Sequence, residues 1–136
     1  MEHEGILRKP SGLIISTLSQ ITGEMSGSLR EYAQSNGLDE TLLLTILRKF
    51  GFPREQFETD LQGYSAGQKR KVLLAASLCQ KAHLYLWDEP LNYLDILSRQ
   101  QLEALLVEYA PTMILIEHDA AFCRAVGDQE VVLKRL

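Results

Sequence analysis

The sequence predicts an α/β fold in which a mostly parallel sheet carries flanking helices and a small helical subdomain. Residues 84–87 and 112–116 are apolar runs of strand length, and the first is apolar on both faces, which is typical of a strand buried in a parallel sheet. Between them, Leu102, Leu105 and Leu106 follow helical spacing. This strand, helix and strand form a unit whose crossover is expected to be right-handed.

Length, composition and charge place the chain among globular proteins with one domain. Its 136 residues are 46% hydrophobic and 24% charged, which suits a single small core. The net charge of −4 and the pI near 5.4 exclude attraction of nucleic acid by overall charge. The basic run at residues 69–71 is interpreted first as a solvated helix face and second as a contact to RNA phosphates.

Neither a membrane span nor a signal peptide is expected. The longest mostly apolar run, residues 72–79, is far shorter than the ~20 residues that cross a bilayer. Glu2 and Glu4 stand where a signal peptide carries positive charge. A cytoplasmic location without membrane insertion is predicted, where Cys79 and Cys123 stay reduced as core thiols.

The first 20 residues are predicted to form a β-hairpin. Runs at residues 5–7 and 13–18 favour strands, and the Pro-Ser-Gly segment at residues 10–12 favours a turn between them. The second run ends near Gln20, which by itself has the character of an exposed loop residue.

Residues 21–63 are predicted to form the helical subdomain. A short helix is expected over residues 28–34, and Asp39 suits the N-cap of the next helix, which Gly51 ends. The buried stripe of that second helix follows helical spacing and comprises Leu43, Ile46, Leu47 and Phe50.

A further helix is expected to begin after Ser65, which suits its N-cap. The unpaired amides of a first helical turn and the positive end of the helix dipole form a natural seat for a phosphate. Gly67 keeps that end open, because a Cβ there could obstruct an approaching ligand. On its own, the same pattern also describes an ordinary helix cap.

Acidic and polar residues follow the two predicted strands. Asp88 and Glu89 come directly after the first strand, and His118 follows the second. Ligands of α/β folds bind at the carboxyl ends of strands, so these residues stand where a ligand would be expected. Alone, the acid pair could be a surface turn and the histidine a structural hydrogen-bonding residue.

Several short motifs in this order resemble an ATP-binding cassette (ABC) domain. Residues 64–68, Tyr-Ser-Ala-Gly-Gln, resemble the signature motif Leu-Ser-Gly-Gly-Gln, and residues 88–95 are similar to the Asp-Glu-Pro-Thr-Asn-His-Leu-Asp string of the ABC-F branch, with Leu91 and Tyr93 as substitutions. The resemblance implies a partial P-loop NTPase cassette of the ribosome-protection type. Its parts would be a hairpin with the Q-loop (1–20), the helical subdomain (21–63) and the remainder through the final strand (64–136).

The resemblance also implies a role for each candidate residue. Asp88 would hold Mg²⁺, usually through water, and Glu89 would orient and deprotonate the attacking water. Gln20, in the Q-loop, would coordinate Mg²⁺ and report the nucleotide state. His118 would hydrogen-bond the γ-phosphate of ATP.

Four further residues are implied to act across a pair of cassettes. Ser65, Gly67 and Gln68 would meet ATP held by the opposite cassette, and Asp95 of the D-loop would contact that cassette. The expected cofactors are ATP and Mg²⁺, and the expected partner is a second ABC cassette.

No Gly-x-x-x-x-Gly-Lys-[Ser/Thr] phosphate loop (Walker A motif) occurs in these residues. Such a loop supplies the amide nest for the α- and β-phosphates. ATP hydrolysis is therefore expected of an intact parent protein, whose missing N-terminal part is a second expected partner, and not of this chain alone. Without the P-loop strand, the strand at residues 84–87 is expected to lack a neighbour, and self-association is expected to cover the open edge.

The predicted function is ATP hydrolysis within an ABC-F protein that acts on the ribosome, through rRNA contacts of the parent, in antibiotic resistance or translation. Two alternatives stay open. One is a non-catalytic cassette fragment for dimerisation or regulation, which the absent phosphate loop favours; the other is the cytoplasmic ATPase subunit of an ABC transporter. Half of an SMC-like ATPase ranks last, because no sustained heptads precede Tyr64.

Overall fold

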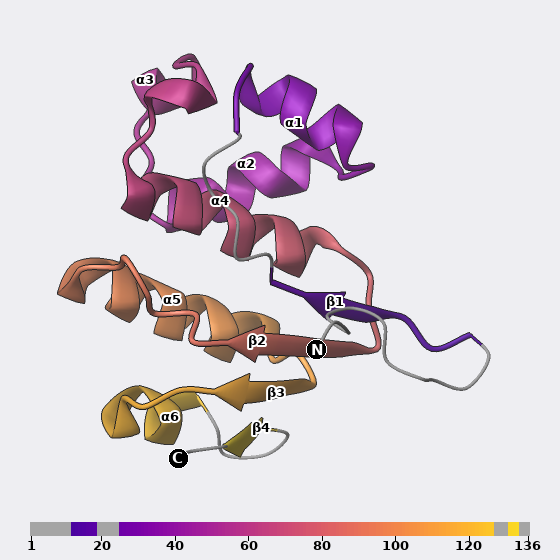
Figure 1. Ribbon diagram of the computed structural model, residues 1–136, viewed down its shortest axis with the longest axis vertical. Helices are drawn as coiled ribbons and strands as arrows, with labels where there is room; N and C mark the ends of the chain where they lie inside the picture. The colour runs from indigo at the N-terminus through magenta and orange to yellow at the C-terminus, as the bar shows by residue number, and fades with distance from the viewer. Residues whose placement is uncertain (1–11, 19–24, 127–130, 134–136) are drawn as a thin grey trace.

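The computed structural model describes residues 12–18, 25–126 and 131–133. Within them, four parallel strands form one sheet whose spatial order follows the chain (Figure 1). The strands are β1 (Ile15–Thr17), β2 (Leu84–Asp88), β3 (Met113–Ile116) and β4 (Val131–Leu133). The predicted α/β class with a parallel sheet is confirmed.

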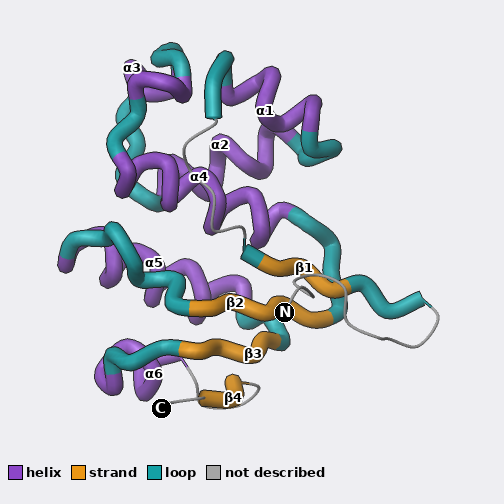
Figure 2. Tube along the Cα trace, viewed as in Figure 1, coloured by secondary structure: helices purple, strands orange, loops and turns teal. Residues whose placement is uncertain are grey.

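The helices form a layer beside the sheet and a separate group beyond it. In Figure 2, α1, α2 and α3 gather on the far side of α4 from the strands. The helices of the described residues are α1 (Leu29–Ser35), α2 (Glu40–Lys49), α3 (Arg54–Phe57), the 3-10 helix η1 (Leu61–Gly63), α4 (Ala66–Cys79), α5 (Ile96–Tyr109) and α6 (Ala120–Val126). Among the described helices, none combines the length and the apolar character that crossing a membrane requires.

Local sequence signals set the helix ends, and Asp39, Ser65 and Gly51 do so as predicted. The side chains of Ser28, Asp39 and Ser65 each accept a hydrogen bond from the backbone amide three residues further on, at 3.1–3.2 Å. Gly51 follows α2 in the left-handed conformation, with φ of 88°, which glycine adopts at low cost. The predicted stripe of α2 is fully buried and consists of Leu43, Ile46, Leu47 and Phe50.

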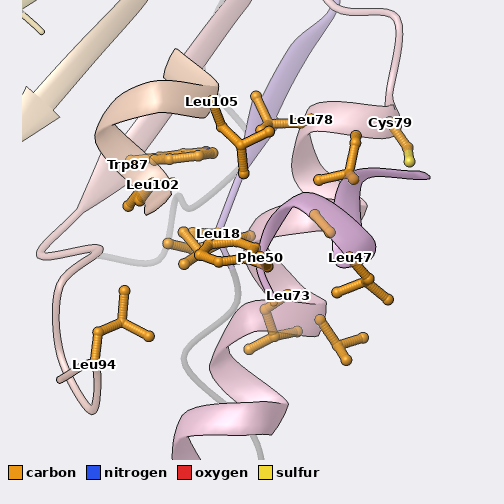
Figure 3. Packing of buried hydrophobic residues seen from close by; sticks show 14 of the residues in the cluster. Leu18, Leu47, Phe50, Leu73, Leu78, Cys79, Trp87, Leu94, Leu102 and Leu105 are labelled. Carbon is orange, nitrogen blue, oxygen red and sulfur yellow. The ribbon is translucent and has the colours of Figure 1, made fainter. Parts of the chain in front are cut away.

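Helix α4 is the centre of the core. It is buried on nearly all sides, because it lies between α2 and the sheet. The Oγ of Ser77 accepts a hydrogen bond from Trp87 Nε1 at 2.9 Å and lies 2.8 Å from Ser16 Oγ, which ties α4 to β2 and β1. Figure 3 shows Trp87 beside Leu102 and Leu105 of α5. Helices α4 and α5 therefore cover the same face of the sheet.

The two faces of the sheet are buried unequally, so the expectation that β2 is buried on both faces is wrong. Trp87 and its register partner Leu115 are fully buried beneath the helices. On the opposite face, Thr17, Leu86 and Ile114 share one register row and are only partly buried. Parallel strands that follow one another in chain order, with crossovers of one hand, place their connecting helices on one face, which explains the asymmetry.

The expectation that β2 lacks a neighbour is also wrong. β2 pairs in parallel with β1 on one side and with β3 on the other. Both ladders occupy its backbone groups, so this strand offers no open edge for self-association. Within the described sheet, the outer strands are β1 and β4.

The first hairpin strand at residues 5–7, most of the turn at residues 10–12, and Gln20 lie outside the described residues. The prediction for the cysteines is confirmed, because Cys79 and Cys123 are buried and unpaired. Burial raises the pKa of the Cys79 thiol to about 12, so this thiol stays protonated at neutral pH.

Candidate nucleotide site

The candidate site lies where β2 and β3 end side by side. Asp88, the last residue of β2, is exposed and stands in register with Ile116, the last residue of β3. The amide of Glu89 donates to the carbonyl of Ile116 at 2.7 Å. Residues that leave the two strands are therefore delivered to one edge of the sheet, the carboxyl edge at which α/β folds bind ligands.

Glu89 and His118 meet at this edge. Their side chains approach to 3.3 Å between Glu89 Oε2 and His118 Nε2. The side chains remain 40% and 62% exposed, respectively, so a ligand has access to both. Glu89 adopts φ of 52°, a left-handed conformation that is uncommon for a residue with a Cβ and that recurs at functional sites.

Glu117 shapes the turn that carries His118. Its Oε2 accepts hydrogen bonds from the amides of His118 and Asp119 at 3.0 and 3.3 Å. Asp119 in turn accepts from the amide of Phe122 at 3.0 Å at the start of α6 and pairs with Arg99 Nη1 at 3.3 Å. The turn after β3 is thus fixed by its own carboxylates.

The end of β2 is held from α4 by Arg70, whose side chain is almost fully buried at 1% exposure. Its Nη2 donates to the carbonyl of Glu89 at 2.7 Å and its Nε to the carbonyl of Pro90 at 3.4 Å. Burial lowers the pKa of Arg70, while Asp88 and Glu117 are among the nearby groups that act against this effect. The sequence does not distinguish Arg70 from its neighbours, because Lys69 and Lys71 make it part of a basic run.

The basic run at residues 69–71 does not form a solvated face. Arg70 is buried, and Lys71 donates from Nζ to the carbonyl of Phe50 at 3.1 Å. The interpretation as a solvated face is therefore wrong, and two of the three cations are committed to contacts inside the protein. The reason is that α4 is surrounded by other elements, which a local charge pattern does not reveal.

The N-terminus of α4 is closed by a reciprocal capping box. Ser65 Oγ accepts from the amide of Gln68 at 3.1 Å, and Gln68 Oε1 accepts from the amide of Ser65 at 2.8 Å. The Nε2 of Gln68 donates to Gln56 Oε1 at 3.0 Å. Among the described residues, the amides of Ala66 and Gly67 have no hydrogen-bond partner and are available to an anion.

Gly67 is required by a contact within the chain. A Cβ on Gly67 would lie 2.8 Å from the carbonyl oxygen of Tyr93, in the loop between β2 and α5. The sequence predicts that glycine leaves room for a ligand, and the structure adds that the same position leaves room for the backbone of Tyr93. Tyr93 itself has φ of 72° and is 64% exposed.

Gly67→Ala is therefore expected to destabilise the fold by about 1–2 kcal/mol, because overpacking against backbone outweighs the better helix propensity of alanine. Gly63→Ala is the matched control, since a Cβ there meets only Thr59 Cγ2 at 3.9 Å. Urea unfolding of both variants measures the difference. Equal midpoints for the two variants would show that the Tyr93 carbonyl moves aside without cost.

Asp95 caps α5 and stands in an exposed apolar patch. Its carboxylate accepts from the amide of Ser98 at 2.8 Å, and this hydrogen bond is the main reason why the pKa of Asp95 is lowered. Around it, Tyr93, Ile96 and Leu97 are 64%, 74% and 62% exposed. We call these three residues the D-loop patch.

The structure thus brings together Asp88, Glu89 and His118 at the sheet edge, and places Asp95 at the start of α5. The described residues contain no group of three or more His, Cys, Asp or Glu side chains that could hold a metal ion. Mg²⁺ in nucleotide sites is usually held by one or two carboxylates together with water and phosphates. Asp88, exposed at the strand end, is the residue that fits that role.

With this geometry in view, the comparisons with known proteins identify the family. A family model described as "ABC transporter" matches residues 8–92. Since this is more than half of the 136 residues, the chain belongs to the ABC transporter family of ATP-binding cassette proteins. The predicted resemblance to the ABC-F branch is confirmed by its relatives, which include VmlR of Bacillus subtilis and YheS of Escherichia coli.

Curated relatives are matched along a small part of their length. The putative ATP-binding protein YdiF of Bacillus subtilis is 28% identical over 134 residues, which cover 96% of this chain and 21% of YdiF. The ribosome protection protein VmlR is 31% identical over 88 residues, which cover 65% of this chain and 16% of VmlR. The chain therefore spans about a fifth or less of the length of these relatives.

Solved structures share the fold. The chain is similar to a protein in "Model of ribosome-bound archaeal Pelota and ABCE1", with a TM-score of 0.73, 23% identity and coverage of 89% of this chain and 21% of that chain. It is also similar to a putative cobalt transport ATP-binding protein, with a TM-score of 0.68, 23% identity and coverage of 88% and 47%. Because the identity is 23% in both cases, the similarity establishes the fold alone, which is that of an ABC ATPase domain.

Proposed function

We propose that this chain forms part of an ATP-hydrolysing ABC domain of the ABC-F type. The observation that carries the proposal is the meeting of Glu89 and His118 at 3.3 Å on the carboxyl edge of the sheet, directly beside Asp88. ABC domains use ATP and Mg²⁺. The cradle for the α- and β-phosphates would come from polypeptide outside these residues, because the sequence contains no phosphate loop.

In this proposal each residue at the sheet edge has one task. Glu89 accepts the proton of the attacking water on its carboxylate, and His118 orients that carboxylate and the γ-phosphate region through Nε2. Asp88 holds Mg²⁺, which, when bound, neutralises charge on the phosphates. Gln20 is assigned to the same metal by resemblance and lies outside the described residues.

The second half of the proposed site acts across a pair of cassettes. The available amides of Ala66 and Gly67, with the hydroxyl of Ser65, form an anion seat at the N-terminus of α4. Gln68 shapes this seat through the capping box, and Asp95 contacts the partner cassette from within the D-loop patch. The partner is a second ABC cassette.

A nucleotide-binding titration followed by a phosphate-release assay tests the proposal. The chain alone is expected to release no phosphate, whereas the full cassette pair, with the P-loop portion present, is expected to hydrolyse ATP. Turnover by the chain alone would overturn the dependence on an external phosphate cradle. A full pair that binds ATP without releasing phosphate would favour the alternative, a non-catalytic cassette for dimerisation or regulation.

Action on the ribosome is the finer part of the proposal. It is supported by similarity to VmlR, which is named a ribosome protection protein, and by the fold shared with a protein from a ribosome-bound complex. Fold similarity to a putative cobalt transport ATP-binding protein keeps a transporter subunit as the alternative. Co-sedimentation of the full protein with ribosomes in the presence of a slowly hydrolysed ATP analogue distinguishes the two, because a transporter subunit is not expected to sediment with ribosomes.

The D-loop patch predicts a large effect on cassette pairing. Ile96→Ser combined with Leu97→Ser is expected to raise the dissociation constant of the ATP-bound pair by about tenfold or more, because each buried side chain of this size contributes about 1.5–3 kcal/mol. Val107→Ser is the matched control, since Val107 is 63% exposed elsewhere on α5. Sedimentation velocity measures the association. An equal effect of the control would remove the patch from the interface.

A further inference from the structure

Arg70 is an unusual residue to find inside a protein of this size. Among the described buried residues it is the only one with a permanently charged side chain. Its guanidinium makes no ion pair within the described residues and instead donates to two backbone carbonyls. Burying a cation without a paired carboxylate is costly, so the contacts it makes require an explanation.

The two carbonyls belong to Glu89 and Pro90, the first residues after β2. They are contacted by Nη2 at 2.7 Å and by Nε at 3.4 Å. On its other side, the amide of Glu89 donates to the carbonyl of Ile116 at 2.7 Å. The backbone of Glu89 is therefore held by α4 through its carbonyl and by β3 through its amide.

The backbone that Arg70 and Ile116 contact is strained at Glu89. Glu89 has φ of 52°, a conformation that a residue with a Cβ keeps only when its surroundings enforce it. Relaxation of Glu89 to a negative φ would turn its peptide groups away from Arg70 or from Ile116. The direction in which the Glu89 side chain leaves the backbone, and hence its 3.3 Å approach to His118, depends on this hold.

We infer that Arg70 is a positioning residue that fixes the Glu89 carboxylate for hydrolysis. The inference rests on the proposed function, in which Glu89 accepts the proton of the attacking water. Arg70 also lies on the helix whose N-terminus carries Ser65 and Gly67. A nucleotide bound at the start of α4 is thereby connected through one helix to the carboxylate at the end of β2.

Hydrogen exchange of backbone amides tests whether Arg70 fixes the backbone of Glu89, and it can be measured on this chain without any nucleotide. In Arg70→Met, the Glu89 amide is expected to exchange about tenfold faster relative to the amide of Leu74, which lies in the middle of α4 and reports global opening. Lys69→Met is the matched control, because it removes an adjacent positive charge that makes no ion pair within the described residues. Lys69→Met is expected to leave the ratio of Glu89 to Leu74 exchange rates unchanged.

A second variant guards against loss of the fold. Arg70→Lys keeps the charge and supplies one ammonium for the two carbonyls, so a smaller acceleration at Glu89 is expected. If Arg70→Met does not fold, the ratio of Glu89 to Leu74 exchange rates in Arg70→Lys becomes the test of the inference. A Glu89-to-Leu74 ratio equal to that of the wild type in the folded variant would overturn the inference, whatever the catalytic activity.

Turnover by the full cassette pair tests the consequence. Arg70→Met is expected to lower kcat by about ten- to a hundredfold while KM stays within about twofold, since it removes a preorganised geometry and not a contact to ATP. In a Glu89→Gln background the same change is expected to add less than about twofold, because the group that it positions is already absent. Additive losses would overturn the role toward Glu89. A wild-type pair without turnover would overturn the proposed function. The Glu89-to-Leu74 exchange ratio would still show whether Arg70 fixes the backbone of Glu89.

Discussion

A cassette pair that carries Glu89→Gln is expected to bind ATP and to lose about a hundred- to ten-thousandfold of its turnover, the range that general acid–base catalysis contributes. Glutamine keeps the size of the side chain and its hydrogen-bonding geometry toward His118 Nε2, but it cannot accept the proton of water. Steady-state phosphate release gives kcat, and a fluorescent nucleotide gives the affinity.

Glu103→Gln is the control for this experiment. Glu103 lies on α5, carries the same charge and makes no hydrogen bond or ion pair within the described residues. Its replacement is expected to change turnover by less than about twofold, in line with a surface substitution. If Glu89→Gln behaves like Glu103→Gln, then Glu89 is not the base and the reading of the sheet edge as a hydrolytic site fails.

Trp87→Ala is expected to lower the free energy of unfolding by about 3–5 kcal/mol, the range for removing a large aromatic side chain from a core. Trp87 is fully buried and precedes Asp88 directly, so the cavity would lie beneath the candidate site. It also donates from Nε1 to Ser77 Oγ at 2.9 Å, and that partner would be left with Ser16 alone. Against a total stability of about 5–15 kcal/mol, the variant sits at the limit of folding.

Trp87→Phe separates the two contributions. It retains most of the volume and removes the indole donor, so a loss of about 1–2 kcal/mol is expected from the hydrogen bond and the smaller ring. Unfolding should be followed by circular dichroism, because the chain contains a single tryptophan and its fluorescence is lost in both variants. Equal stability of Trp87→Ala and the wild type would show that the helices collapse onto β2 and fill the space.

The parts of the fold that depend on neighbouring residues could be predicted from the sequence. Asp39 and Ser65 indicate helix starts because their side chains accept hydrogen bonds from amides three residues further on, and Gly51 ends α2 because glycine adopts φ of 88° without strain. The acids after residue 87 and the histidine after residue 116 indicate the sheet edge, because parallel strands align their carboxyl ends.

The incorrect expectations concern the assembly of these elements. The apolar pattern of residues 84–87 predicts a strand and, with residues 112–116, a neighbour on one side, but it does not show that β1 pairs with β2 on the other side. Lys69 and Arg70 are adjacent cations with different surroundings, because only Arg70 points toward the loop after β2. The contact of position 67 with the carbonyl of Tyr93 was not foreseen either, because it joins two segments that are distant in the sequence.

The protonated, buried state of Cys79, with its pKa raised to about 12, has a practical value for studying cassette pairing. Burial likewise raises the pKa of Cys123, so thiol reagents at neutral pH have little thiolate to attack at either native position. A cysteine introduced by Ile96→Cys, where the side chain is 74% exposed, would then take up a fluorescent dye selectively. The native chain thus accepts a single optical reporter in the D-loop patch without removal of its own cysteines.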